Sequence, residues 1–486
     1  MPDTSLTVRY EPVIGLEVHA QLKTNTKIFC GCSTGFTVES NKNVCPVCLG
    51  MPGVLPVLNK KTVELAVRFG LALDAKVNLT SIFARKNYFY PDLPKGYQIS
   101  QFSLPVVGEG VLKVETGEGG IREIGVLRAH LEEDAGKSIH DRGDFTLVDV
   151  NRCGVPLLEI VSKPEIRSAA EAAAYLRTMR QILLFLDICD GNMEEGSLRC
   201  DANISVRPVG ETRLGTKTEI KNMNSFRNVE RAINYEIERQ IELLEDGGSV
   251  VQQTLLWNAD KGIATPMRSK EDSHDYRYFP DPDLMPLVID EEWFQQIKSE
   301  MPELPATKKQ RFVKQFSLPE YDAGILTQQP DYSSYFEEAA ACTSNYKELS
   351  NWMMTEVLKV ANQEKIDLSD FKIEPKRLAE LVNLISSGSI SGKIGKEIFA
   401  QMLSSTLSPT EIVEKDGLFQ ISDENELSHI INKLLDENEL QVQEYLAGKE
   451  KVLGFFVGRT MKETKGKANP SSVNNILLDL LNSRRK

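Results

Sequence analysis

The chain has 486 residues and a formal net charge of -13, with 41% hydrophobic and 26% charged residues. A chain of this length is too long for one hydrophobic core, so we expect about three domains. The acidic net charge excludes a protein that coats nucleic acid through its overall charge. Any contact with nucleic acid must therefore come from a local basic patch. Because no apolar run could span a bilayer and residues 1–9 lack a signal-peptide pattern, we expect a cytoplasmic protein without membrane contact.

The first pattern is a strand over residues 13–22, in which apolar residues alternate with Glu17, His19 and Gln21. Side chains two apart on a strand leave the same face about 6.6 Å apart, so Glu17 and His19 lie side by side. Such a pair can share a metal ion, although the polar face of a strand is more often merely solvated. The choice between these interpretations depends on what the other strands bring to this face.

Four of the eight cysteines form two closely spaced pairs. Cys30 and Cys32 are followed, after twelve residues, by Cys45 and Cys48, and both pairs lie in turns that contain Gly or Pro. Two pairs of soft thiolate ligands favour tetrahedral zinc over a redox Cys-x-x-Cys or buried thiols. With sulfur at all four positions, the zinc would be structural rather than catalytic.

A helix, an aromatic loop and a hairpin are expected next along the chain. Apolar residues at helical spacing predict the helix over residues 59–73. The loop at 85–97 interleaves aromatic with basic residues, among them Lys86. This composition suits an anionic or aromatic ligand, or else a packed, proline-stiffened loop. Residues 108–120 are rich in glycine and predict a hairpin.

Three further segments, at residues 126–134, 197–207 and 217–221, repeat the alternation of the first strand, and the first of them is expected to turn Leu127 to its apolar face. Glu159 lies in a fourth, strand-like segment at residues 155–161. One buried and one polar face are typical of an antiparallel sheet. The polar face would carry Arg128, His130, Glu132, Asp134, Glu159, Arg199, Asp201, Asn203, Lys217, Glu219 and Lys221.

If these strands are neighbours, their polar side chains combine into a site for phosphoryl transfer, in which positioning and charge compensation do most of the work. The residues that could hold Mg²⁺ are Glu17, His19, Glu132 and Glu159. The basic residues that could neutralise phosphate charge are Arg199, Lys217 and Lys221. A solvated sheet face stays open as the alternative.

Helices are expected to cover the apolar face of this sheet. Ser168 is the predicted N-cap of a helix that ends near residue 186, and a second helix runs from about residue 224 to the glycines 247–248. A polar and aromatic loop follows at residues 268–283. Its composition indicates only a loop that lies near a charged group.

Four separated segments resemble the family of aspartyl/glutamyl-tRNA(Asn/Gln) amidotransferase B subunits. They are the stretches GLEVHAQL at 15–22, RKNYFYPD at 85–92, DVNRCGVPLLE at 149–159 and DYRYFPDPD at 275–283. They follow the family's order, and the resemblance extends over nearly the whole chain. Several separated motifs are more specific than any single pattern.

The resemblance implies an α+β fold with three domains. A glutamine-synthetase-like, antiparallel-sheet cradle would span residues 9–297, with the zinc knuckle at 30–48. An all-α helical domain would follow at 298–412, and a small α-helical tail domain at 413–486 would contact tRNA. The resemblance also implies a heterotrimer, in which the other members are the amidase, or A subunit, together with a small C subunit.

The resemblance further implies the reaction. ATP would phosphorylate the side-chain carboxylate of Glu-tRNA(Gln) or Asp-tRNA(Asn), and ammonia that the amidase partner releases from glutamine would form the amide. Whether one or both tRNAs are substrates stays open. We find no nucleophile for glutamine hydrolysis in this chain, which is why a partner is needed.

The resemblance also implies site residues. The Mg²⁺ ligands of the family correspond to Glu17, His19, Glu132 and Glu159, its zinc ligands to the four clustered cysteines, and its site lysine to Lys86. The other expected catalytic residues come from the polar sheet face and are Arg199, Asp201, Glu219 and Lys221. The residues expected to bind ATP are Lys217, Arg268 and Arg277.

Beyond residue 297 helical periods replace the alternation, with short amphipathic helices predicted over 310–405. The segment GSISGK at 388–393 is not a phosphate loop, because only three residues separate its glycines and Ile394 stands where Ser or Thr would bind Mg²⁺. We expect a helix-turn-helix connection there. At 449–467 six basic residues stand against two acidic ones, which suits either an RNA backbone or a solvated helix face.

Two other functions stay open. A stand-alone ATP-dependent carboxylate-amine ligase would act on a free amino acid and would not need residues 413–486. A non-catalytic, zinc-containing RNA-binding scaffold would turn over no ATP.

Overall fold

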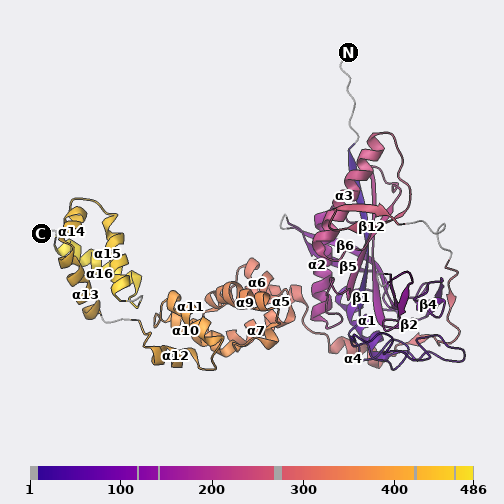
Figure 1. Cartoon of the computed structure of the whole chain (residues 1–486), viewed down its shortest axis with the longest axis horizontal. Helices are drawn as coiled ribbons and strands as arrows, with labels where there is room; N and C mark the ends of the chain where they lie inside the picture. The colour runs from indigo at the N-terminus through magenta and orange to yellow at the C-terminus, as the bar shows by residue number, and fades with distance from the viewer. Residues whose placement is uncertain are drawn as a thin grey trace, which may run out of the picture. The chain divides into compact units, whose positions relative to one another are not determined.

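The structure is a computed structural model that describes residues 9–117, 120–140, 143–267, 276–420, 424–464 and 467–484. Its contacts divide the chain into one compact unit, Met1–Pro305, and a second, Ala306–Lys486. The first unit contains the sheets, and the described residues of the second are helical (Figure 1). Each unit is described by itself.

The large sheet of the first unit has, within the described residues, the strand order β13-β12-β11-β10-β1-β9-β6-β5. Its strands are β1 (Tyr10–Gln21), β5 (Gly110–Glu115), β6 (Ile121–Glu133), β9 (Pro156–Ser162), β10 (Leu198–Pro208), β11 (Thr218–Lys221), β12 (Thr254–Asn258) and β13 (Ile263–Pro266). Neighbours pair antiparallel except β11 and β12, which run parallel. The expectation of an antiparallel sheet is therefore wrong at this pair. A helical crossover joins the two strands and returns the chain in the same direction.

The alternation seen in the sequence is confirmed as alternating burial. In β1, Ile14, Leu16, Val18 and Ala20 are buried, while the residues between them are partly exposed. Three helices pack against the strands on the buried side: α1 (Lys60–Ala72), α2 (Ala169–Phe185) and α3 (Phe226–Glu245). Figure 1 shows α2 and α3 beside the strands. Each begins at a side chain that accepts a hydrogen bond from a backbone N–H of the first turn, and these N-caps are Asn59, Ser168 and Ser225.

Strand β6 departs from strict alternation at a β-bulge between Val126 and Arg128. Leu127 is 40% exposed, so its predicted place on the apolar face is wrong. A bulge sets two residues against one on the partner strand and shifts the following side chains by one position. Ala129 and Leu131 lie beyond the bulge and are buried again.

Shorter strands complete the first unit and join distant segments. The pairs are β3 (Ala84–Asn87) with β4 (Tyr97–Ser100) and β14 (Phe279–Pro280), β2 (Thr80–Ser81) with β15 (Leu287–Val288), and β7 (Lys137–Ile139) with β8 (Leu147–Asp149). Phe279 pairs with Arg85, so the described part of the 275–283 motif lies beside the 85–92 motif. Helix α4 (Glu291–Ser299) packs against α1.

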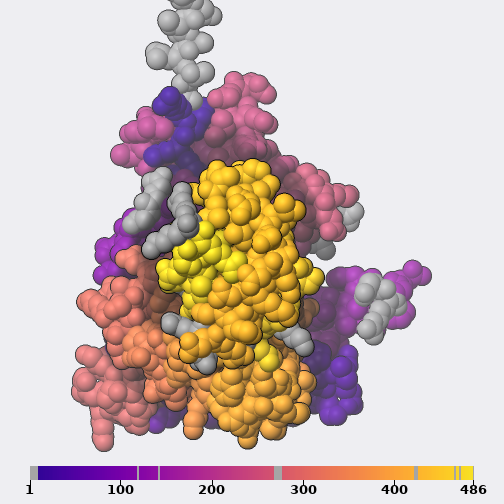
Figure 2. Space-filling model, turned by 90° about the vertical axis from the view of Figure 1, so that its left-hand side faces the viewer, coloured from indigo at the N-terminus to yellow at the C-terminus, as the bar shows by residue number. Residues whose placement is uncertain are grey.

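The second unit contains α5 (Pro305–Gln315, which starts at the unit boundary), α6 (Glu320–Leu326), α7 (Pro330–Ala340), α8 (Tyr346–Trp352), α9 (Leu358–Glu364), α10 (Pro375–Ser386), α11 (Gly392–Met402), α12 (Pro409–Asp416), α13 (Glu424–Glu437), α14 (Glu439–Leu446), α15 (Val452–Glu463) and α16 (Pro470–Ser483). The predicted helix-turn-helix connection at 388–393 is confirmed between α10 and α11. One core extends from Phe312 to Val413, and another begins at Leu427. The helices that contribute to the second of these cores, α13 to α16, are gold and yellow in the space-filling view of Figure 2. Every helix in the described ranges is too short or too polar to cross a bilayer.

Candidate active site

Strand register brings the predicted polar side chains onto one face. On β1, His19 lies opposite Arg199 of β10 on one side and Glu159 of β9 on the other. Glu159 in turn lies opposite His130 of β6. Because directly opposed residues share a sheet face, these four side chains form a line across four neighbouring strands.

Three of the predicted Mg²⁺ ligands converge. His19 Nε2 lies 3.4 Å from Glu159 Oε2 and 3.5 Å from Glu132 Oε1, and the ligand atoms of all three residues lie within 4.8 Å of one another. Glu132 is buried, and its Oε2 accepts no hydrogen bond from any described residue. A buried carboxylate oxygen without a partner fits a cation that would take that position. The donor set of one imidazole and two carboxylates therefore suits a divalent metal.

The electrostatics of this cluster favour a positive charge between the two carboxylates. Burial lowers the pKa of His19, but the hydrogen bond with Glu159 and the charges of Glu132 and Glu159 outweigh it and raise that pKa to about 9. Burial and the charge of Glu159 raise the pKa of Glu132 to about 7. The imidazoles of His130 and His19 overcome burial and hold the pKa of Glu159 well below its ordinary value.

His130 belongs to this cluster, although no role was predicted for it. Its Nε2 lies 3.3 Å from Glu159 Oε2 and 4.0 Å from Glu132 Oε2, and its side chain is 5% exposed. The alternation in the sequence had placed His130 on the polar face, two residues before Glu132. Only the pairing of β6 with β9 reveals that it contacts Glu159.

Glu17 lies in a neighbouring group rather than among the three converging ligands. Its Oε1 accepts a hydrogen bond of 3.0 Å from Asn203 Nδ2, and it stands opposite Asp201 in the register. Lys221 Nζ lies 2.6 Å from Asp201 Oδ2 and 2.9 Å from Glu219 Oε1. Burial and then the charge of Glu159 raise the pKa of Glu17, which therefore lies close to both groups.

Two further predicted catalytic residues lie beside the cluster: Arg199 stands opposite His19 in the register, and the charges of Glu132 and Glu159 act on Lys86. The Nζ atom of Lys86, on β3, lies 4.8 Å from the ring centre of Tyr276. Burial lowers the pKa of Lys86, but the charges of Glu132 and other groups outweigh burial and raise it. Arg199 Nη2 contacts Asp134 Oδ2 at 2.9 Å.

The residues predicted to bind ATP are either exposed or outside the described part of the structure. Lys217 is exposed and precedes β11, which begins one residue later than the sequence pattern suggested. Arg277 is exposed, and its carbonyl accepts a hydrogen bond from Asn87. Arg268 lies outside the described residues, as do the polar residues His274 and Asp275 of the same loop.

The four clustered cysteines converge as predicted. Their Sγ atoms lie within 4.8 Å of one another. The hydrogen bond between Cys30 and Cys48 lowers the pKa of Cys48 to about 4 and raises the pKa of Cys30, while burial raises the pKa of Cys32 to about 11. One thiolate is therefore favoured at Cys48, and a bound metal would displace the protons of the other thiols. Four converging sulfur atoms fit a tetrahedral zinc.

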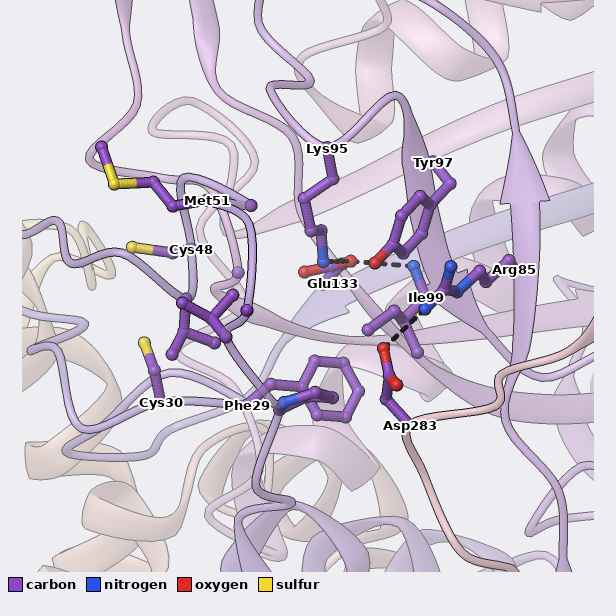
Figure 3. Close-up of a pocket in the computed structure, with 16 residues that line it drawn as sticks. Phe29, Cys30, Cys48, Met51, Arg85, Lys95, Tyr97, Ile99, Glu133 and Asp283 are labelled. Atoms are coloured by element: carbon purple, nitrogen blue, oxygen red, sulfur yellow. Dashed lines mark hydrogen bonds and ion pairs between the residues drawn. The ribbon is translucent and has the colours of Figure 1, made fainter.

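A cavity of about 220 Å³ lies between the cysteines and a polar wall (Figure 3). Cys30 and Cys48 line one side. On the other, Lys95 pairs with Glu133, and Arg85 Nη2 contacts Asp283 Oδ2 at 2.8 Å. Glu133 directly follows Glu132 on β6, so consecutive positions of one strand face the cavity and the group of His19, Glu132 and Glu159.

Comparisons with known proteins place nearly the whole chain in one family. Residues 12–295 match the family model described as the GatB/GatE catalytic domain, and residues 334–481 match the GatB domain. Proteins named as B subunits of the aspartyl/glutamyl-tRNA(Asn/Gln) amidotransferase are similar in Pelodictyon phaeoclathratiforme (55% identity over 97% of this chain and 99% of the relative) and Thermodesulfovibrio yellowstonii (54% over 98% and 100%). The resemblance inferred from four motifs is thereby confirmed. The chain belongs to the family of aspartyl/glutamyl-tRNA(Asn/Gln) amidotransferase B subunits.

Proposed function

We propose that this chain uses Mg-ATP to phosphorylate the side-chain carboxylate of mischarged Glu-tRNA(Gln), Asp-tRNA(Asn) or both, and that ammonia then converts the activated group into the amide. The relatives are named as one subunit of an amidotransferase for these tRNAs. The observation that carries the proposal is the convergence of His19, Glu132 and Glu159 beside Lys86 on a polar sheet face.

The chain's own residues would position and neutralise the reacting groups. A substrate carboxylate oxygen attacks the terminal phosphorus and ADP leaves, after which ammonia attacks the acyl carbon and phosphate leaves. The three converging ligands would hold a magnesium ion, which supplies compensation for the phosphate charge when it is bound. Lys221 on one side and Lys86 on the other would compensate the remaining negative charge during transfer.

We propose two partners in a heterotrimer, which are the amidase, or A subunit, together with a small C subunit. The word "subunit" in the relatives' names supports a multi-subunit enzyme. We identify no nucleophile for glutamine hydrolysis in the described residues, so the ammonia must come from elsewhere. We also propose a cytoplasmic location, because charged tRNAs would be the substrates.

We propose a division into a glutamine-synthetase-like cradle (9–297), a helical domain (298–412) and a tail domain (413–486). The separate cores on either side of residue 420 support a distinct tail, and because α12 and Val413 belong to the core before it, the boundary of the tail core lies after α12 rather than at residue 413. The tail would bind tRNA through its basic residues, which in the described part are Lys449, Lys451, Arg459, Lys462 and Lys467. Lys465 lies outside that part. A structural zinc would occupy the cysteine cluster.

The proposal is tested in the reconstituted complex with Glu132→Gln and His19→Ala. Both variants should lower amide formation at least 100-fold and leave glutamine hydrolysis by the partner in place, because only the phosphoryl-transfer site is altered. Glu123→Gln is the matched control, since Glu123 lies on the same strand with a side chain that is 65% exposed. Unchanged transamidation in Glu132→Gln and His19→Ala would refute the metal assignment.

The two competing functions predict different outcomes. A stand-alone ligase would form the amide on free glutamate without tRNA, and its activity would survive removal of residues 413–486. A scaffold would show no ATP turnover in any complex.

A further inference from the structure

One end of the polar sheet face carries three exposed apolar side chains. Leu256, Ile263 and Met267 are 42%, 37% and 47% exposed, respectively. They lie on and just beyond β12 and β13, at one edge of the large sheet. They surround Thr265, which lies opposite Leu256 on the same face. Scattered apolar residues are common on protein surfaces, but three around one position at one edge form a patch. We call these three side chains the apolar platform.

Register places the platform on the same face as the candidate active site. Thr254 Oγ1 donates a hydrogen bond of 3.0 Å to Glu219 Oε2, so Thr254 and, two residues on, Leu256 share the face of Glu219. Ile263 lies opposite Asn258 of the same face. Met267 donates its backbone N–H to the carbonyl of Thr254, which continues the pairing and sets Met267 opposite it.

A row of side chains leads from the platform to the metal cluster. Leu256 pairs with Lys221, Lys221 contacts Asp201, and Asp201 lies opposite Glu17. At about 4.8 Å per strand, this row is on the order of 14 Å long. Beyond it, His19 is the next residue of β1 on this face. The order along the face is therefore apolar, then cationic, then carboxylates that can hold a metal.

We propose that the apolar platform binds the purine base of ATP, with the triphosphate extended along this row towards His19. The inference rests on the proposed function and adds the orientation of the nucleotide to it. Aliphatic side chains can cover the apolar face of a purine, and Lys221 stands where the phosphate chain would pass. The row has about the length that an extended nucleoside triphosphate spans between base and terminal phosphate. This direction leaves the side of Lys86 for the aminoacyl group.

The test compares two probes on the full-length chain, Mg-ATP and Mg-tripolyphosphate, by titration calorimetry. Leu256→Ala and Met267→Ala should each weaken ATP binding about tenfold, because each removes apolar contact with the base. Tripolyphosphate has no base, so its affinity should change less than about twofold. The KM for ATP in the assembled enzyme should rise with the loss of ATP affinity.

Val111→Ala is the control, because Val111 is 41% exposed on β5, the opposite edge strand of the same sheet. It should alter neither affinity. Unchanged ATP binding in both platform variants would overturn the assignment of the base and leave the proposed function standing. Equal weakening of both probes would also overturn it, since that result indicates local damage. If the unmodified chain bound neither probe, the proposed function itself would fail.

Discussion

Glu17 and His19 lie two residues apart on β1, yet they contact different partners. His19 meets Glu159 and Glu132, whereas Glu17 accepts a hydrogen bond from Asn203. On a strand each side chain shares its row with the side chains directly opposite, so two positions on one face belong to two rows. The residue pair that suggested one metal site therefore contributes to two adjacent groups.

At the residue scale, the affinity of the cluster for Mg²⁺ should rise with pH. The pKa of His19 is raised to about 9 and that of Glu132 to about 7, so protons occupy both groups at the lower pH values. A metal must displace these protons, and each is lost as the pH rises through the corresponding pKa. Calorimetric titration between pH 6 and pH 9, in buffers of different ionisation enthalpy, would count the protons released. An affinity independent of pH would contradict this account.

His130→Ala should weaken binding of Mn²⁺ or Mg²⁺ by about 10-fold to 100-fold, because Glu159 loses the imidazole that lies 3.3 Å away and orients it. His130→Gln should restore part of the affinity, since its amide N–H₂ can donate to the same carboxylate. Paramagnetic resonance of bound Mn²⁺ would measure both variants. Equal affinities in the unmodified chain and His130→Ala would show that His130 only fills space.

At the element scale, the sequence pattern predicted the elements that depend on residues close in the chain. Strands β1, β9 and β10, the N-cap Ser168 and the α10–α11 connection depend on residues close in the chain, and all are confirmed. The bulge at Leu127 and the parallel pair β11–β12 were not predicted. Both depend on how a strand meets its neighbour, which a single strand's alternation does not contain.

In the candidate site, too, the sequence predicted which face a residue lies on but not which residues touch. Alternation alone placed His19, His130 and Glu132 on polar faces, and Glu159 was expected beside them from a strand-like segment. Which of them touch is set by the register between β1, β6 and β9, whose residues are far apart in the sequence. That register separated Glu17 from the other ligands and added His130 to them.

The cysteine cluster gives a prediction for a whole loop. Cys45→Ser together with Cys48→Ser should abolish zinc binding and lower the melting temperature of the first unit, because a four-sulfur site stabilises the loop that it closes. Metal analysis by mass spectrometry and calorimetric melting would measure the effect. Cys342→Ser is the control, since Cys342 is an exposed free thiol elsewhere in the chain. Zinc retained by the double variant would refute the site.

The pair Lys95 and Glu133 joins the β3–β4 region to β6. The two side chains are only 10% and 4% exposed, and Ile99 also donates its backbone N–H to Glu133 at 2.8 Å. Lys95→Met should therefore lower the free energy of unfolding by about 3 kcal/mol, because it leaves a buried charge without its partner. Lys113→Met removes a pair exposed by 67% and 65%, so it should cost less than about 1 kcal/mol in the same urea titration. Equal costs would contradict the role of burial.

At the scale of the whole molecule, an acidic chain carries its basic cluster at one end. The formal net charge is -13, while residues 449–467 contain six basic and two acidic side chains. An overall negative charge repels RNA, so the tRNA contacts proposed for this chain would be local. Separate hydrophobic cores allow the carboxyl-terminal helices to fold as their own body.

Deletion of residues 421–486 should weaken tRNA binding at least tenfold and flatten its dependence on salt concentration, because fewer phosphate contacts release fewer counterions. Filter binding over a series of salt concentrations would measure both quantities. Binding of Mg-ATP by the truncated chain should be unchanged, which serves as the internal control. Unaltered tRNA affinity would instead favour a ligase that acts on a free amino acid.

The consecutive glutamates of β6 limit how this gene can vary. Glu132 faces His19 and Glu133 faces the cavity, and a strand alternates its faces with every residue. A one-codon insertion or deletion just before them would exchange the two environments and disable both at once. The hairpin turn between β5 and β6 precedes the strand, so a change in its length would leave the faces of Glu132 and Glu133 unchanged. Length variation among functional homologues should therefore collect at residues 116–120 and be absent from 128–133.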